Sequence, residues 1–442
     1  MNNQKWMMGT LALGLMAGAV VSGSGIQQEA GANAKHNQKQ VKNVIFMIPD
    51  GYSASYATNY RWYADEEETT LDQHLTGMMR TYSANSKVTD SAAAGTAMAT
   101  GVKTNNGTIS MDPNGKELTS VLEKANQTGK ATGLVATSTI THATPAVFAS
   151  HVASRASEAE IAKQYMDELE VDVLLGGGQD YFTTEQDGGL QKEDLIARAE
   201  AAGYTYATNA DELETANASK LLGLFAPEAM APELDREMTE EPSLAEMTTA
   251  ALTSLNQDKD GFFLMVEGSQ IDWAGHAHDA AWAMKDSEAF HDAFQKAIQF
   301  AMKDKQTLVV VAGDHDTGGM SVGGYNEYVA KPEVLRSVTA TGDFMVDSFD
   351  ESLTNVRDVV ERYTSLTLTE AEVKAIQAAE SPKRTLVLNE IISKRAYVGW
   401  TTSQHTGVDV PLYAYGPQHD RFTGVLDNTD VPKQIMQALK LK

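Results

Sequence analysis

Acidic side chains stand directly after several short apolar runs of the chain, where strands are predicted to end. They are Asp50 after the run 44–48, Glu267 after 262–266, and Asp314 with His315 after 307–312. In an open parallel sheet, ligands bind beyond the carboxyl ends of the strands, so these side chains are expected to converge there. One of them alone would be more typical of a turn-forming Asp or a hydrogen-bonded His. Their coincidence at three strand ends indicates a metal site.

A second pattern pairs a carboxylate with imidazole. Asp272 and His276 are four residues apart, so they share a face if the segment is helical. Carboxylate oxygen and imidazole nitrogen suit Zn²⁺, although a surface Asp–His pair would show the same spacing. His278 and Asp279 lie off that face and are not included. His405 stands alone in a polar, turn-rich stretch and specifies nothing by itself.

Ser91 is the candidate nucleophile. It follows Asp90 and precedes an alanine-rich run that predicts a helix beginning at the serine. Free N–H groups and the positive dipole end at such a position favour a bound phosphate or an alkoxide. A capping serine on a packing helix would look similar, but the lack of large side chains would let a substrate approach. Ser321 fits G-x-S-x-G, yet the strand and helix that a nucleophile elbow needs are not adjacent to it.

The elements that must position these residues alternate between strands and helices. Further apolar runs at 134–136 and 171–175 are separated by helical patterns such as 157–169 and 194–202. Such alternation predicts an α/β fold with a large, mostly parallel central sheet and helices on both faces. Residues 181–254 and 318–398 lack the strand rhythm. We interpret both as helical or irregular insertions in a single domain that spans 35–442.

Composition restricts the partners and the chemistry. The 442 residues carry 35 Lys and Arg against 60 Asp and Glu, a net charge of −25, and no cysteine. The acidic excess argues against nucleic acid or an anionic membrane as a partner. Without cysteine, the chain has no disulfide, no Cys-bound zinc and no Cys nucleophile.

The N-terminal residues predict export. Lys5, the apolar run 7–21 and Ala-Asn-Ala at 32–34 follow the order of a secretory signal peptide, which we assign to 1–34. The run is shorter than the ~20 residues of a membrane-spanning helix. No later stretch is predicted to span a membrane, so the mature protein is expected to be secreted, periplasmic or cell-wall-associated.

Taken together, the motifs resemble those of alkaline phosphatases over nearly all of the mature chain. The matching segments, in the expected order, are Pro-Asp-Gly 49–51, Asp-Ser-Ala-Ala-Ala-Gly-Thr 90–96, His-Ala-Thr-Pro 142–145, the segment 267–276, Gly-Asp-His 313–315 and Gln-His-Thr-Gly 404–407. The resemblance implies the alkaline phosphatase fold and hydrolysis of phosphate monoesters through a phosphoserine. It also implies two Zn²⁺ ions, one Mg²⁺ ion and a homodimer.

The resemblance also implies a role for each site residue. One zinc would be held by Asp272, His276 and His405, and the other by Asp50, Asp314 and His315, beside Ser91. Magnesium would be held by Asp50, Thr144 and Glu267. Arg155 would bind phosphate. His142 and Trp273 stand where the enterobacterial pattern has Asp and Lys, as in other bacterial and marine members. We expect these two to act around the magnesium ligands rather than to bind the ion.

Four other functions are weighed against this one. A sulfatase would need a C/S-x-P-x-R setting, which Ser91 lacks. A phosphodiesterase of the same superfamily would share the two-metal ligands, but Thr144 and Glu267 favour a third metal and a monoesterase. A non-catalytic exported phosphate- or metal-binding protein would bind phosphate without turnover. A metal-free serine esterase would stay active in EDTA.

Overall fold

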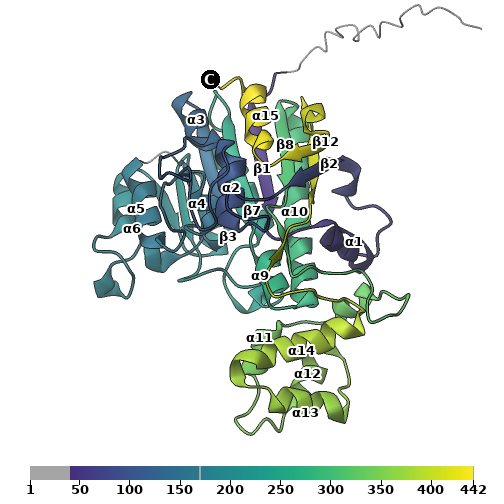
Figure 1. Cartoon of the computed structure of the whole chain (residues 1–442). Helices are drawn as coiled ribbons and strands as arrows, with labels where there is room; N and C mark the ends of the chain where they lie inside the picture. The colour runs from purple at the N-terminus through teal and green to yellow at the C-terminus, as the bar shows by residue number, and fades with distance from the viewer. Residues whose placement is uncertain (1–39, 169–170, 442) are drawn as a thin grey trace, which may run out of the picture. The chain divides into compact units, whose positions relative to one another are not determined.

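A ten-stranded sheet forms the centre of the compact unit Lys39–Lys442 (Figure 1). The computed structural model describes residues 40–168 and 171–441, so the predicted signal peptide lies outside the described residues. The strands follow the order β12-β2-β11-β8-β1-β7-β3-β4-β6-β5 across the sheet. Their bounds are β1 (Asn43–Pro49), β2 (Leu75–Arg80), β3 (Ala131–Thr139), β4 (Val173–Gly177), β5 (Thr205–Ala207), β6 (Leu221–Leu224), β7 (Phe262–Gly268), β8 (Thr307–Ala312), β11 (Val410–Tyr415) and β12 (Gly424–Asp427).

The sheet is mostly parallel, as the sequence predicts. β1 lies between β7 and β8 and is parallel to both, whereas β11 runs antiparallel to β8 and β2. Along β1, Phe46 and Ile48 face one hydrophobic core while Ile45 and Met47 face the other. A strand buried on both faces needs apolar side chains at every position, which explains the continuous apolar runs.

Helices cover both faces of the sheet. Residues of α1, α8 and α10 enter the core that contains Ile45, and residues of α2, α3, α5 and α15 enter the core that contains Phe46 (Figure 1). Within 40–168 and 171–441, none of the helices combines the length and the hydropathy of a membrane-spanning segment. The α-helices are α1 (Ala54–Tyr63), α2 (Ser91–Thr100), α3 (Val121–Gln127), α4 (Ala143–Ala146), α5 (Glu158–Glu168), α6 (Leu195–Ala201), α7 (Ala210–Thr215), α8 (Leu244–Leu255), α9 (Gln270–His276), α10 (Ala280–Asp304), α11 (Gly342–Asp347), α12 (Val356–Thr364), α13 (Glu370–Ala378), α14 (Ser381–Arg395) and α15 (Asp430–Leu439).

Shorter elements complete the fold. β9 (Asp316–Thr317) and β10 (His405–Thr406) form a separate two-stranded antiparallel ribbon. The 3₁₀ turns are η1 (Asp72–His74), η2 (Gln179–Tyr181), η3 (Glu185–Asp187), η4 (Arg236–Met238), η5 (Pro332–Ser337) and η6 (His419–Phe422).

The two segments without strand rhythm differ from each other. Residues 181–254 contain β5 and β6, which extend the sheet in parallel beyond β4, so the expectation of helical or irregular structure is wrong for these two strands. They are three and four residues long, which is too short to show a clear alternation. Residues 318–398 carry η5 and α11 to α14, and these helices lie together below α9 in Figure 1.

Candidate metal centre and nucleophile

The carboxyl ends of β1, β7 and β8 bring together the side chains that the sequence placed there. Asp50, Glu267 and Asp314 are at most 1% exposed. The turn after β1 depends on Gly51, whose φ is +73° and whose N–H donates to Asp314 Oδ1 at 3.1 Å. A Cβ at this position would lie 2.9 Å from Asp272 Cα, so only glycine allows this close approach.

A first cluster consists of Asp272, His276 and His405. Asp272 and His276 share one face of α9, as the i,i+4 spacing predicts, and β10 supplies His405. The two Nε2 atoms lie 3.2 Å apart, and they are 3.3 and 3.4 Å from Asp272 carboxylate oxygens. These three residues form a group that could hold a metal ion.

Backbone carbonyls orient both imidazoles of this cluster. His276 Nδ1 donates to Ser403 O at 2.8 Å, and His405 Nδ1 donates to Thr89 O at 2.9 Å. Because a carbonyl can only accept, each ring carries a proton on Nδ1, and the Nε2 of the neutral ring turns its lone pair toward Asp272. Two lone pairs and a carboxylate repel one another unless a cation lies between them. The donor set therefore fits Zn²⁺.

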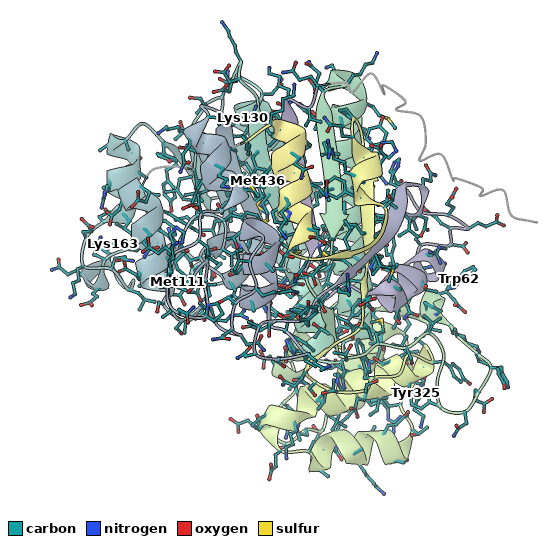
Figure 2. The ribbon with its side chains drawn as sticks, turned by 45° about the horizontal axis from the view of Figure 1, so that its top comes forward. Trp62, Met111, Lys130, Lys163, Tyr325 and Met436 are labelled. Carbon is teal, nitrogen blue, oxygen red and sulfur yellow. The ribbon has the colours of Figure 1, made fainter. Side chains whose placement is uncertain are left out.

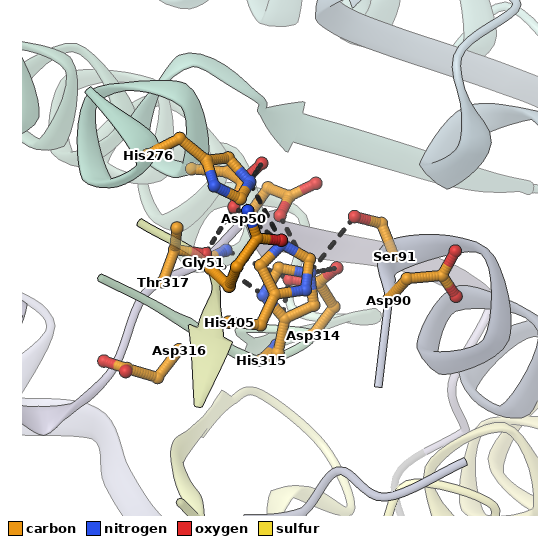
Figure 3. Close-up of polar contacts among 12 residues, drawn as sticks. Asp50, Gly51, Asp90, Ser91, His276, Asp314, His315, Asp316, Thr317 and His405 are labelled. Atoms are coloured by element: carbon orange, nitrogen blue, oxygen red, sulfur yellow. Dashed lines mark hydrogen bonds and ion pairs between the residues drawn. The ribbon is translucent and has the colours of Figure 1, made fainter. Parts of the chain in front are cut away.

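A second cluster joins the serine to the strand ends. His315 Nε2 lies 3.1 Å from Asp314 Oδ2 and 3.5 Å from Asp50 Oδ1. The same nitrogen lies 3.1 Å from Ser91 Oγ, and Figure 3 shows the serine side chain pointing toward it. Asp272 lies close to this cluster as well, since its carboxylate, Asp50 and His315 also form a group that could hold a metal ion.

Oxygen ligands dominate the third group. Thr144 Oγ1 donates to Asp50 Oδ2 at 3.3 Å, and Ser138 Oγ lies 3.4 Å from Glu267 Oε2. Asp50 Oδ1 and Glu267 Oε1 are buried and make no hydrogen bond to any described residue. Burial raises the pKa of Glu267 to about 7, and burial together with Asp314 raises the pKa of Asp50 well above its usual range. A cation would stabilise these carboxylates in their ionised form, and their oxygens fit Mg²⁺.

The helix predicted to begin at Ser91 is α2. Asp90 is its N-cap and accepts a hydrogen bond from Ala93 N at 3.0 Å, while Gly101, with φ +79°, ends it. The small residues of this helix are buried, and a Cβ on Gly95 would lie 3.0 Å from Val147. Packing against the neighbouring α4 segment therefore accounts for the small side chains of α2, without the need for substrate access that the sequence suggested.

Two neighbours hold Arg155 at the edge of the site. Its NH1 donates to Asp90 Oδ2 at 3.2 Å and its NH2 donates to His142 Nε2 at 3.0 Å. Burial and the arginine charge lower the pKa of His142 to about 3, so the ring is neutral and accepts from the guanidinium. Trp273 lies edge-to-face with this ring, at a centroid distance of 5.7 Å.

Comparison with known proteins decides the family. The family model for alkaline phosphatase matches residues 41–441. The chain belongs to the alkaline phosphatase family. It is 43% identical to alkaline phosphatase 3 of Bacillus subtilis (strain 168), over 96% of this chain and 94% of the relative. Both the recognised resemblance and the phosphomonoesterase activity that it implied are thereby confirmed.

Solved structures confirm the predicted fold. The cold-active alkaline phosphatase of a psychrophilic Shewanella sp. matches with a TM-score of 0.82 and 35% identity, covering 90% of this chain and 99% of that one. A TAB5 alkaline phosphatase with a histidine-to-aspartate substitution and Mg bound in its M3 site matches with a TM-score of 0.69 and 29% identity, covering 92% and 99%.

In this alkaline phosphatase, Thr317 is a further residue of the site that was not predicted from the sequence. Its Oγ1 donates to Asp272 Oδ1 and lies 3.3 Å from His315 Nδ1, so it contacts a residue of each cluster. It also pairs with His405 in the β9–β10 ribbon. Its position two residues after His315 is the signal that could have identified it.

The serine-esterase motif has a structural role. Ser321 Oγ donates to Gly323 O at 2.7 Å and accepts from Gly399 N at 3.0 Å. No helix follows it directly, because residues 322–331 are turns and irregular backbone up to η5. Ser321 therefore ties together two loops of the alkaline phosphatase fold, without the context that a nucleophile needs.

Proposed function

We propose that this alkaline phosphatase hydrolyses phosphate monoesters through a phosphoserine at Ser91, with two zinc ions and one magnesium ion. The observation that carries the proposal is the position of Ser91 Oγ. It lies at the first turn of α2 and 3.1 Å from His315 Nε2, beside both histidine-carboxylate clusters.

Each ion would have its own ligands. Zinc would be bound by Asp272, His276 and His405 at one position and by Asp50, Asp314 and His315 at the other, and magnesium by Asp50, Thr144 and Glu267. Bound there, the ions would act as Lewis acids that stabilise negative charge on the serine oxygen and on the departing alcohol oxygen. The TAB5 variant that holds Mg in its M3 site carries aspartate in place of a histidine, so it supports a third metal position in this fold.

Ser91 performs the covalent step. Its oxygen bonds to phosphorus as its proton passes to solvent, the bond between phosphorus and the ester oxygen breaks, and that oxygen takes up a proton to leave as the alcohol. Water then adds to phosphorus, the bond between Ser91 Oγ and phosphorus breaks, and inorganic phosphate is released while the serine regains a proton. The N-terminal N–H groups of α2 favour negative charge near Ser91. Ser91 is 1% exposed and its Oγ lies 3.1 Å from His315 Nε2, so the serine oxygen stands beside the proposed zinc ligands.

Arg155 binds the phosphoryl group. Its planar guanidinium can donate to two non-bridging oxygens at once, which a lysine ammonium cannot do. Asp90 and His142 hold the guanidinium from its two nitrogen ends. The arginine, the helix terminus and the bound cations would make the site locally positive in a chain of net charge −25.

Export and assembly complete the proposal. The signal-peptide pattern at 1–34 supports export, and the family resemblance supports a homodimer. The N-terminal sequence of the protein recovered outside producing cells tests the first. Light scattering of the purified mature chain tests the second.

Hydrolysis of an aryl phosphate at alkaline pH tests the mechanism. Ser91→Ala should lower kcat by at least ~10³-fold and yield no phosphoserine peptide after acid quench. Ser321→Ala should keep the wild-type kcat and still yield the phosphoserine peptide. EDTA should abolish wild-type activity, and zinc with magnesium should restore it. Chelator-insensitive hydrolysis would overturn the metal mechanism, and preferred turnover of a diester would indicate a phosphodiesterase.

A further inference from the structure

Three consecutive carbonyls of the loop before β10 are each held by a different donor. Two donors are imidazoles and one is a backbone N–H. The pairs are His278 Nε2 to Thr402 O at 3.0 Å, His276 Nδ1 to Ser403 O at 2.8 Å, and Gly318 N to Gln404 O at 2.9 Å. The middle carbonyl orients a metal-cluster imidazole, so the bonds on either side of it fix its direction.

His278 is built into this arrangement at a backbone cost. Its φ is +53°, a left-handed value that is uncommon for residues other than glycine. The residue is 6% exposed, and its ring stacks on Trp400 at an interplanar angle of 2° and a centroid distance of 5.1 Å. Its Nδ1 faces Glu390 Oε1 at 3.2 Å. Both ring nitrogens and one ring face are therefore occupied.

Helix α14 holds the same residue from the other side. Ser393 Oγ donates to His278 O at 2.9 Å and accepts from Trp400 Nε1 at 3.1 Å. One turn earlier, Asn389 Nδ2 donates to Ala277 O at 2.9 Å. The backbone that follows His276 is thus bonded to α14 at two successive carbonyls.

We propose that His278 is a positioning residue for the metal centre, because it clamps the loop 399–404 to helix α14 and so fixes Ser403 O against His276 Nδ1. The inference rests on the proposed function, in which His276 and His405 bind zinc. It assigns the helical segment 318–398 a role in retaining that ion.

The expected effect is on metal retention. Groups that orient a ligand without touching the metal typically change metal affinity by ~10–100-fold. If His278 no longer holds Thr402, the adjacent Ser403 carbonyl gains freedom and His276 loses its fixed ring orientation. A residue that only filled space would change thermal stability without changing the rate at which zinc is released.

Zinc release from the zinc-loaded full chain into excess chromogenic chelator separates these two roles. His278→Phe keeps a ring against Trp400 and removes both nitrogens, so release of one zinc should be ~10-fold faster. His278→Gln, which restores a donor near the Nε2 position, should recover most of the wild-type rate. Ser393→Ala should accelerate release less, because it loosens only the contact with α14.

The matched control is His291→Phe. His291 is also buried, stacks on Tyr60 at a centroid distance of 4.0 Å and donates to Ser287 O, all outside the clusters. It should lower Tm and leave zinc release unchanged. Equal release rates for His278→Phe, Ser393→Ala and wild type would overturn the proposal. A wild-type chain that retains no zinc would instead overturn the proposed function, and a His278→Phe chain that fails to fold leaves Ser393→Ala to decide.

Discussion

The two ends of the central strands differ in whether their polar side chains have hydrogen-bond partners within the chain. At the amino end, Asn43 Nδ2 lies 3.1 Å from Thr307 Oγ1 and 3.3 Å from Asp304 Oδ2, and Asn43 Oδ1 accepts from Phe262 N. Lys130, labelled in Figure 2, donates to the carbonyls of Lys42 and Asp260. At this end, the chain supplies its own partners.

At the carboxyl end of the same strands, several buried polar atoms lack a partner or face one another. Asp50 Oδ1 and Glu267 Oε1 find no hydrogen-bond partner among the described residues. The Nε2 atoms of His276 and His405 face each other across 3.2 Å. Burial of such groups is costly unless cations join them. The strands are therefore anchored at their amino ends, while their carboxyl ends remain available for chemistry.

The sharpest test exchanges one carboxylate at each end for an amide. Asp272→Asn should weaken zinc binding by more than ~100-fold, beyond the effect expected for a residue that only supports a ligand, and abolish phosphatase activity. Asp304→Asn should cost about 1 kcal/mol of unfolding free energy and leave zinc content and kcat unchanged. Elemental analysis, urea unfolding and aryl phosphate hydrolysis measure these effects. A loss of zinc in Asp304→Asn would contradict the separate roles of the two strand ends.

Arg155 lies at the edge of the metal site, and its guanidinium donates to Asp90 and His142. Because it is not a proposed metal ligand, its replacement should leave the bound metals in place. Arg155→Lys removes the planar fork that can donate to two phosphate oxygens, and kcat/KM for an aryl phosphate should fall by ~30-fold. Zinc and magnesium contents should stay at the wild-type level. Lost metal with unchanged kinetics would place Arg155 among the groups that organise the ions.

The convergence of these side chains was predictable from the sequence because most of them stand at strand ends. Asp50, Glu267, Asp314 and His315 each follow an apolar run, and the i,i+4 spacing placed Asp272 and His276 on one helix face. The carbonyls of Ser403 and Thr89 escaped prediction because every residue has a carbonyl, and only the fold selects two of them. β5 and β6 were not predicted because strands of three or four residues are too short to show a clear alternation of apolar and polar side chains.

A smaller effect, on magnesium binding, is expected from a change at His142. This histidine contacts Arg155 and is expected to lie around the magnesium ligands. His142→Asp would place a carboxylate near Thr144 and Asp50 and add an oxygen ligand suited to magnesium. The magnesium concentration needed for half-maximal activity should fall by ~10-fold while zinc content stays constant. Elemental analysis with magnesium titration measures both. Equal changes in both metals would contradict the separation of the third group from the two zinc clusters.

The smallest expected effect is a pH-dependent change in unfolding free energy at His151, whose two ring nitrogens both have partners within the chain. Its Nδ1 lies 3.0 Å from Ser110 O and its Nε2 lies 2.8 Å from Glu123 Oε1. Burial alone would lower the pKa of His151, but the bond to Glu123 outweighs it and raises the pKa to about 9. The stabilisation is therefore complete below about pH 6.5 and is lost as the pH rises through about 9.

With a discount for partial exposure, Glu123→Gln should cost about 1–2 kcal/mol of unfolding free energy at pH 6 and almost nothing at pH 10. The glutamine keeps an acceptor for Ser120 N, which Glu123 caps in α3. Urea unfolding of the metal-loaded wild type and variant at both pH values measures the difference, which cancels the pH dependence of the metal site. An equal difference at pH 6 and pH 10 would mean that the pair contributes packing and no charge.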